Sequence, residues 1–114
     1  METLNEYIRA VIEYTSYPWN DNPEIVNSAH DKIIAAFKKL KKNNELSHLK
    51  ELINHENKGV VLWASTHLLI VDENLALQNL EKILKEKEQY SFSAEMVIRE
   101  WKSGRLNLEY PNIK

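Results

Sequence analysis

The scarcity of glycine and proline is the feature that most constrains how this chain of 114 residues can fold. Two glycines and three prolines are present, about 4% of the chain where average usage is about 12%. This excludes collagen, low-complexity linkers, most turn-dense β-sandwiches and any glycine-rich phosphate loop. Residues 24–58 and 60–103 contain neither type. Each stretch is too long for one average helix, so other polar residues are expected to mark breaks within it.

The composition predicts one folded domain that covers residues 1–114. Hydrophobic residues make up 43% of the chain and charged residues 28%, so a core can form and disorder is not expected. The 15 basic and 17 acidic side chains leave a formal charge of -2. Nucleic-acid binders usually carry an excess of lysine and arginine, so nucleic acid is not the expected partner.

No sequence feature indicates export, a membrane span or cysteine chemistry. The absence of cysteine removes disulfides, thiolate nucleophiles and zinc fingers. The N-terminus lacks a basic region followed by an apolar stretch, which a signal peptide requires. The longest apolar runs, Val60–Ala64 and Leu68–Val71, are much shorter than a membrane span. We therefore expect a cytoplasmic protein with no membrane attachment.

Hydrophobic spacing predicts an all-α fold of about six helices. Apolar residues recur every three or four positions along most of the chain, which is the helical period. The helices are expected to form three antiparallel pairs, at about residues 3–42, 45–70 and 72–103, followed by a short tail at 104–114.

Polar residues and the few prolines and glycines predict the helix ends. Asn22 before Pro23 is typical of an N-cap followed by proline at the first helical position. Gly104 is expected to end the last helix in the left-handed conformation. The remaining breaks are expected at Asn43–Asn44, at Asp72 and at Ser91 or Ser93.

Two of the predicted pairs resemble each other. The first helices match at an offset of 31, through Leu49, Leu52 and Ile53 against Leu80, Ile83 and Leu84. The second helices match at an offset of 34, through Val60, Trp63, Ala64 and His67 against Ala94, Val97, Ile98 and Trp101. Paired helices with a period in the thirties are typical of an α-solenoid, in which stacked pairs share a core. A generic helical bundle is the alternative.

The stretch 49–64, LKELINHENKGVVLWA, resembles a HEAT repeat: a leucine-rich helix, an asparagine-containing turn and an alanine-bearing second helix. The stretches 60–69, VVLWASTHLL, and 92–106, FSAEMVIREWKSGRL, resemble a small bacterial family known as domain of unknown function 2019 (DUF2019). The resemblance covers most of residues 24–106 and implies a HEAT-like α–α superhelix. It implies no activity, because the family is uncharacterised. HEAT-like repeats usually carry arginine where this chain has Val61, so an arginine–aspartate ladder is not expected.

No catalytic, cofactor-binding or metal site is predicted. His48, Glu51 and His55 have the residue types and helical spacing of a metal site. The turn at Asn54 is expected to end the helix before His55 aligns, which favours a solvated polar face. His67 lies on an apolar stripe, so a packed histidine is expected there rather than a base. The motifs of serine hydrolases and zinc proteases are missing from the sequence.

Tyr14, Tyr17 and Trp19 are the candidate partner-binding residues. They cluster around Pro18, where the first helix is expected to end. Tyrosine and tryptophan are enriched at binding hot spots, because they bury a large area with little loss of rotamer freedom. The alternative is that Trp19 covers the end of the solenoid as a cap.

These observations favour a small HEAT-like module that binds a protein and is not an enzyme. One narrower form is an immunity protein that neutralises a basic toxin. A nucleic-acid-associated HEAT-like protein is one alternative, and it would need lysines clustered on a concave face. A hydrolase is the other, and it would need a pocket joining His30, His48 or His67 to a carboxylate. The sequence indicates neither the partner nor the oligomeric state.

Overall fold

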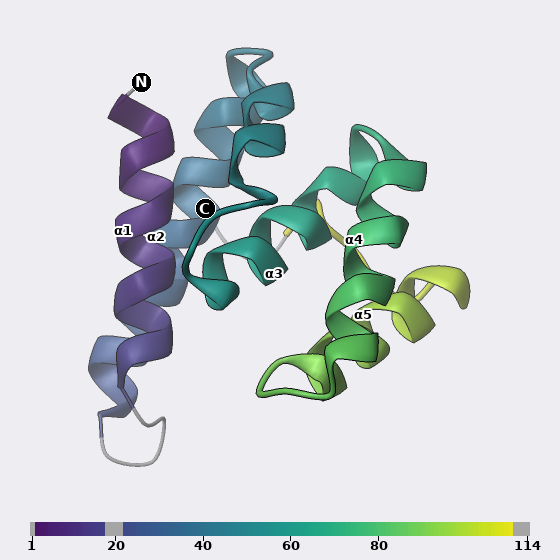
Figure 1. Ribbon diagram of the computed structural model, residues 1–114. Helices are drawn as coiled ribbons and strands as arrows, with labels where there is room; N and C mark the ends of the chain where they lie inside the picture. Colours follow the sequence, from purple (N-terminus) through teal and green to yellow (C-terminus); the bar gives the residue numbers. More distant parts are fainter. Residues whose placement is uncertain (1, 18–21, 111–114) are drawn as a thin grey trace. The chain divides into compact units, whose positions relative to one another are not determined.

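A computed structural model describes residues 2–17 and 22–110, and these residues are all-α (Figure 1). They form five α-helices and two 3₁₀ helices (η), with no strand in those ranges. In chain order the elements are α1 (Glu2–Ser16), α2 (Pro23–Lys42), η1 (Leu46–Leu52), α3 (Lys58–His67), η2 (Leu68–Ile70), α4 (Glu73–Glu86) and α5 (Ser91–Lys102). The predicted fold class is confirmed. No helix among the described residues has the length and apolar character needed to cross a bilayer.

The chain divides into two compact units. Unit 1 comprises the described residues up to His48 together with Tyr110, and unit 2 runs from Leu49 to Glu109.

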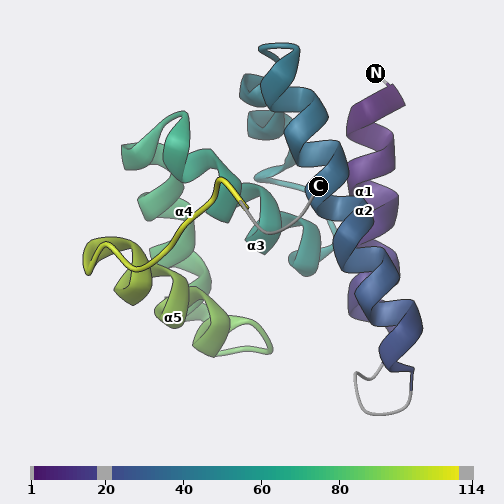
Figure 2. The same ribbon diagram turned by 180° about the vertical axis from the view of Figure 1, so that it is seen from behind.

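Unit 1 is built around α1 and α2, which lie side by side in Figures 1 and 2. Each helix buries one apolar stripe. In α1 the stripe is Leu4, Tyr7, Ala10 and Val11, and in α2 it is Val26, Ala29, Ile33, Ile34, Ala36, Phe37 and Leu40. The Tyr110 ring contacts Phe37 edge-on, with ring centroids 5.7 Å apart. Lys38 Nζ donates a hydrogen bond to the Tyr110 carbonyl at 3.1 Å. The end of the described chain is therefore held on α2.

Asn44 ends α2 in the left-handed conformation that glycine adopts at the ends of many helices. Its φ is 60°, in the left-handed region that asparagine tolerates better than most residues. The backbone N–H groups of Asn44 and Glu45 donate to the carbonyls of Lys41 and Leu40. This is the Schellman pattern, which satisfies carbonyls left free at the end of a helix. The predicted break at Asn43–Asn44 is confirmed.

Unit 2 packs α4 against α3, η2 and α5. Lys58 at the start of α3 forms an ion pair with Glu86 at the end of α4, with the nitrogen and oxygen 3.3 Å apart, so these helices run antiparallel. Trp101 near the end of α5 donates from Nε1 to Glu73 at the start of α4, at 2.6 Å. The same antiparallel relation therefore holds for α4 and α5.

Two predicted helix ends in unit 2 are confirmed. The Asp72 carboxylate accepts a hydrogen bond from the Leu75 N–H at 3.2 Å, which caps α4. Gly104 has a φ of 77°, and the N–H groups of Gly104 and Arg105 donate to the carbonyls of Trp101 and Glu100. This is a second Schellman pattern.

One local prediction is confirmed and two are corrected. Asn22 occupies the N-cap of α2 with Pro23 at the first helical position, as predicted, and its side chain makes no capping hydrogen bond. The segment Leu46–Leu52, the expected first helix of the second pair, is a 3₁₀ helix, a form that proteins use in short pieces. Neither serine caps α5, whose N-cap is Tyr90. The Ser91 hydroxyl instead donates to the Ile83 carbonyl and accepts from the Glu88 N–H.

Mutation of the two N-cap residues, Asp72 of α4 and Asn22 of α2, should change the stability of the protein by different amounts. Asp72→Ala should lower the free energy of unfolding by about 1 kcal/mol, because an N-terminal N–H of α4 loses its acceptor. Asn22→Ala should lower it by only a few tenths of a kcal/mol, since Asn22 makes no side-chain cap bond. Urea titrations measure both values. Asp72→Asn controls for the Lys50 ion pair, and equal losses for the two alanine variants would contradict the assignment.

Two tyrosines of unit 1 predict a loss of stability at alkaline pH. Burial, with a further contribution from Tyr110, holds the pKa of Tyr7 well above its ordinary value. Burial also raises the pKa of Tyr110 to about 12. In the unfolded chain both phenols ionise near pH 10. The stability that the neutral phenols provide is therefore complete below about pH 10 and declines as the pH rises toward 12.

Urea titrations of Tyr110→Phe and of the unchanged chain at pH 8, 10 and 11 test this expectation. The variant should lose less stability between pH 8 and pH 11, while lysine titration affects both proteins alike. Identical losses would show that Tyr110 does not contribute to the alkaline transition.

Candidate functional site

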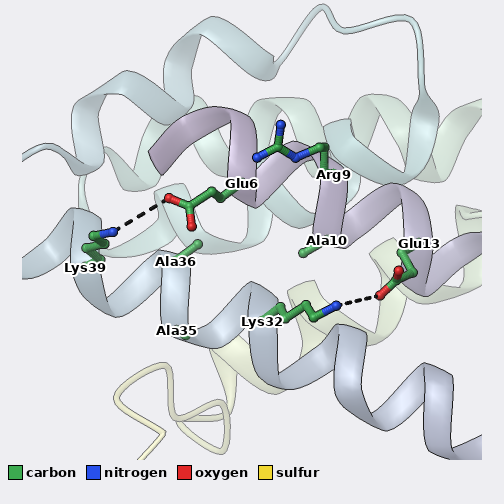
Figure 3. Close-up of a pocket in the computed structure, with 8 residues that line it drawn as sticks. All are labelled: Glu6, Arg9, Ala10, Glu13, Lys32, Ala35, Ala36 and Lys39. Atoms are coloured by element: carbon green, nitrogen blue, oxygen red, sulfur yellow. Dashed lines mark hydrogen bonds and ion pairs between the residues drawn. The ribbon is translucent and has the colours of Figure 1, made fainter. Parts of the chain in front are cut away.

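A groove of about 450 Å³ runs along one side of the α1–α2 pair. Figure 3 shows alanine side chains in its middle and an ion pair at each end. Ala10 and Ala36 are almost fully buried, with 4% and 5% of their surface exposed. Because alanine is small, the two helices leave a depression there. The groove is lined by Glu6, Arg9, Ala10, Glu13, Lys32, Ala35, Ala36 and Lys39.

Two ion pairs cross the groove from α2 to α1. Lys39 Nζ lies 3.6 Å from Glu6 Oε1, and Lys32 Nζ lies 3.4 Å from Glu13 Oε1. Seven residues separate the two glutamates and seven separate the two lysines, a distance of about 10 Å along each helix. Both pairs therefore belong to one antiparallel register of α1 against α2.

Arg9 lies where a third ion pair would complete this ladder. Midway between the two ion pairs, the register brings Arg9 and Ala10 of α1 opposite Ala35 and Ala36 of α2. Alanine offers no carboxylate, and Arg9 makes no ion pair or side-chain hydrogen bond within the described part of the chain. The guanidinium is exposed at the α1 rim of the groove (Figure 3). Three basic and two acidic side chains line the groove, so one positive charge is left unmatched.

Exposed apolar side chains continue the groove toward the connection between α1 and α2. Tyr17 directly follows Ser16, the last residue of α1, at the end of the helix that carries Glu13. Ile25 stands seven residues before Lys32, on the same side of α2. The exposed fractions of Tyr17 and Ile25 are 43% and 40%. We call the eight groove residues together with Tyr17 and Ile25 the groove face.

The three aromatic residues predicted to bind a partner have different environments. Tyr17 is exposed and belongs to the groove face. Tyr14 is half-buried, with its ring centroid 5.9 Å from that of His30. Trp19, like Pro18, lies outside the described residues. The assignment of Tyr14, Tyr17 and Trp19 as partner-binding residues therefore stays a prediction.

Sequence reasoning missed the groove because its residues are far apart in the chain. The charge pattern does contain a signal, since Glu6 and Glu13 share the seven-residue spacing of Lys32 and Lys39. Matching spacings of opposite sign on two helices joined by a short loop predict ion pairs across a hairpin. Arg9, between Glu6 and Glu13, is then the basic residue of this pattern that has no acidic counterpart on the other helix.

The histidines are dispersed over the two units. His67 is fully buried, with its ring centroid 5.7 Å from that of Trp63, as expected for a packed residue. His55 Nδ1 accepts a hydrogen bond from the Asn57 N–H at 3.0 Å. His30 Nδ1 lies 4.0 Å from a carboxylate oxygen of Asp31 on an exposed turn of α2. Within residues 2–17 and 22–110 no three histidine, aspartate or glutamate side chains gather as metal ligands do.

The lysines give no specific support to a nucleic-acid interface. Four of them, Lys32, Lys39, Lys50 and Lys58, lie within 3.6 Å of a carboxylate oxygen. Phosphates would have to compete with these carboxylates for the lysines. The cavity beside α4 is likewise mixed in charge, because Glu81 and Glu86 line it together with Lys82 and Lys85.

Comparison with protein families, with curated proteins and with solved structures gave no match. The site must therefore be interpreted from its own geometry.

The groove residues are expected to contribute little to stability. The side chains of the two ion pairs are between 39% and 61% exposed, and exposed pairs typically contribute less than about 1 kcal/mol. Arg9→Gln, Lys32→Gln and Lys39→Gln should each change the free energy of unfolding by no more than that. A urea titration of each variant measures the change. A loss above about 2 kcal/mol would show that these charges hold the hairpin together.

Proposed function

We propose that this chain is a small protein-interaction module and that the groove face is its contact surface. The observation that carries the proposal is the exposure of Tyr17 and Ile25 at the same end of the α1–α2 pair, next to the groove. Single exposed apolar residues are common on protein surfaces. Here two of them stand near a groove that also presents Arg9, which has no ion pair among the described residues. Tyrosine and arginine are residue types enriched at binding hot spots.

A HEAT-like architecture of the DUF2019 type is part of the proposal, and burial at the repeated positions supports it. Leu49 and Leu52 are buried, as are their counterparts Leu80 and Ile83. The third matched residues of the two helices, Ile53 and Leu84, are both half-buried. In the second helices Val60 and Ala94 are both buried, but Ala64 and His67 are buried where their counterparts Ile98 and Trp101 are half-buried. The equivalence of burial that repeated units require is therefore found mainly in the first helices.

The proposed role is binding in the cytoplasm, without catalysis. The histidines for which a hydrolase pocket was considered, His30, His48 and His67, line neither the groove, nor the cavity beside α4, nor the two smaller cavities around Glu86. A toxin-immunity protein is one form of such a binder.

Site-specific photocrosslinking tests the proposed contact surface. Benzoylphenylalanine replaces Tyr17 in one variant and Phe92 in a matched control. Phe92 is 71% exposed but lies in unit 2. After irradiation of cells that make each variant, position 17 should give a discrete product whose mass is not twice that of the chain. Position 92 should not give this product.

A third variant tests whether the product depends on the groove face. Ile25→Asp places a charge in the apolar part of that face and should abolish crosslinking from position 17. Crosslinked products that are the same for positions 17 and 92, or that persist in the Ile25→Asp variant, would contradict the proposal.

A further inference from the structure

We infer that the partner presents an acidic side chain, aspartate or glutamate, to Arg9 in the gap between the two ion pairs. This inference rests on the proposed function, because it specifies the chemistry of the partner at the same surface. Its basis is the incomplete ladder across the groove. Arg9 has no carboxylate opposite it on α2, where Ala35 and Ala36 stand.

Within residues 2–17 and 22–110, the glutamates near enough on α1 to pair with Arg9 are already engaged. Glu6 and Glu13 lie three residues before and four residues after Arg9 on α1, within the reach of a helical ion pair. However, their carboxylates lie 3.6 and 3.4 Å from lysines of α2. A carboxylate from outside can bind Arg9 without breaking either pair.

The charges around Arg9 favour a carboxylate over a phosphate. The guanidinium can bind a carboxylate through two parallel hydrogen bonds. The groove has one basic side chain more than it has acidic ones, so a single carboxylate balances its charge, whereas a doubly charged phosphate would leave one negative charge in excess. The net charge of -2 on the whole chain opposes the approach of an anion only weakly, because salt screens charges beyond about 8 Å.

The exposed side chains of Tyr17 and Ile25 indicate that the partner also has an apolar side chain near its acidic residue. Tyr17 lies just beyond Ser16, the last residue of α1, and the helix from Arg9 to Ser16 spans about 10 Å. A segment that fills both parts of the groove face therefore carries a carboxylate and, at about that distance, an apolar side chain. Alanines in the middle of the groove allow its backbone to approach closely.

Selection of random peptides displayed on phage against the immobilised full chain tests the inference. The selected peptides should share an aspartate or glutamate at one position and an apolar residue at a fixed distance from it. Fluorescence anisotropy then measures their affinity for the unchanged chain, for Arg9→Gln and for Arg105→Gln. Arg105 is the matched control, since it is an exposed arginine of unit 2.

The affinity should fall about tenfold for Arg9→Gln and stay unchanged for Arg105→Gln. Replacing the shared acidic residue of the peptide by its amide should cause a similar loss, with no further loss when both changes are combined. Equal unfolding midpoints for the two protein variants establish that the loss is not one of folding.

Failure of this inference and failure of the proposed function give different results. Peptides without a shared acidic residue, or with unchanged affinity for Arg9→Gln, would overturn the inference. If such peptides still lose affinity for Ile25→Asp, the groove face remains the contact surface. Peptides that depend on neither Arg9 nor Ile25, or a selection that yields no binding peptide, would overturn both.

Discussion

Burial of one apolar stripe on α1 against one on α2 is the interaction on which unit 1 and its groove depend. Tyr7 and Phe37 are among the largest fully buried side chains of the protein, and burial of such a side chain stabilises the fold by roughly 1.5–3 kcal/mol. The packing of these side chains fixes the register of the hairpin, because a shift along either helix would expose them. With the register fixed, the residues beside the stripes have fixed partners across the groove. The two ion pairs and the position of Arg9 are consequences of the same register.

The core stabilises unit 1 far more than the charges of the groove do. Exposed ion pairs contribute little to stability, so the charges across the groove are not what holds the hairpin together. They do determine which charge remains available on this surface, since each glutamate is matched by a lysine and Arg9 is not. Because the core does not depend on the charge of Arg9, that charge can take part in the proposed binding.

The sequence predicted well those features that depend on neighbouring residues. Helix α2 begins at Pro23 and ends at Lys42 because proline fits a first helical turn and Asn44 tolerates the left-handed conformation. The end of α4 was harder to predict, because the left-handed residue there is Lys87, a position that glycine or asparagine usually occupies. The 3₁₀ geometry of Leu46–Leu52 was missed, because leucine spacing alone does not separate a 3₁₀ helix from a short α-helix.

The groove was missed for a different reason. It depends on which residues of α2 lie opposite α1, and hydrophobic periodicity within one helix does not contain that information.

Binding of an acidic segment of a protein partner to the groove face is the proposed role of unit 1. Chemical-shift mapping in a ¹H–¹⁵N NMR spectrum of the full chain, titrated with an acidic peptide selected on it, tests this role. The shifts should concentrate in Glu6–Tyr17 and Ile25–Lys39, with the Arg9 side-chain resonance among those that move most. Shifts concentrated in unit 2, with Arg9 unchanged, would contradict it.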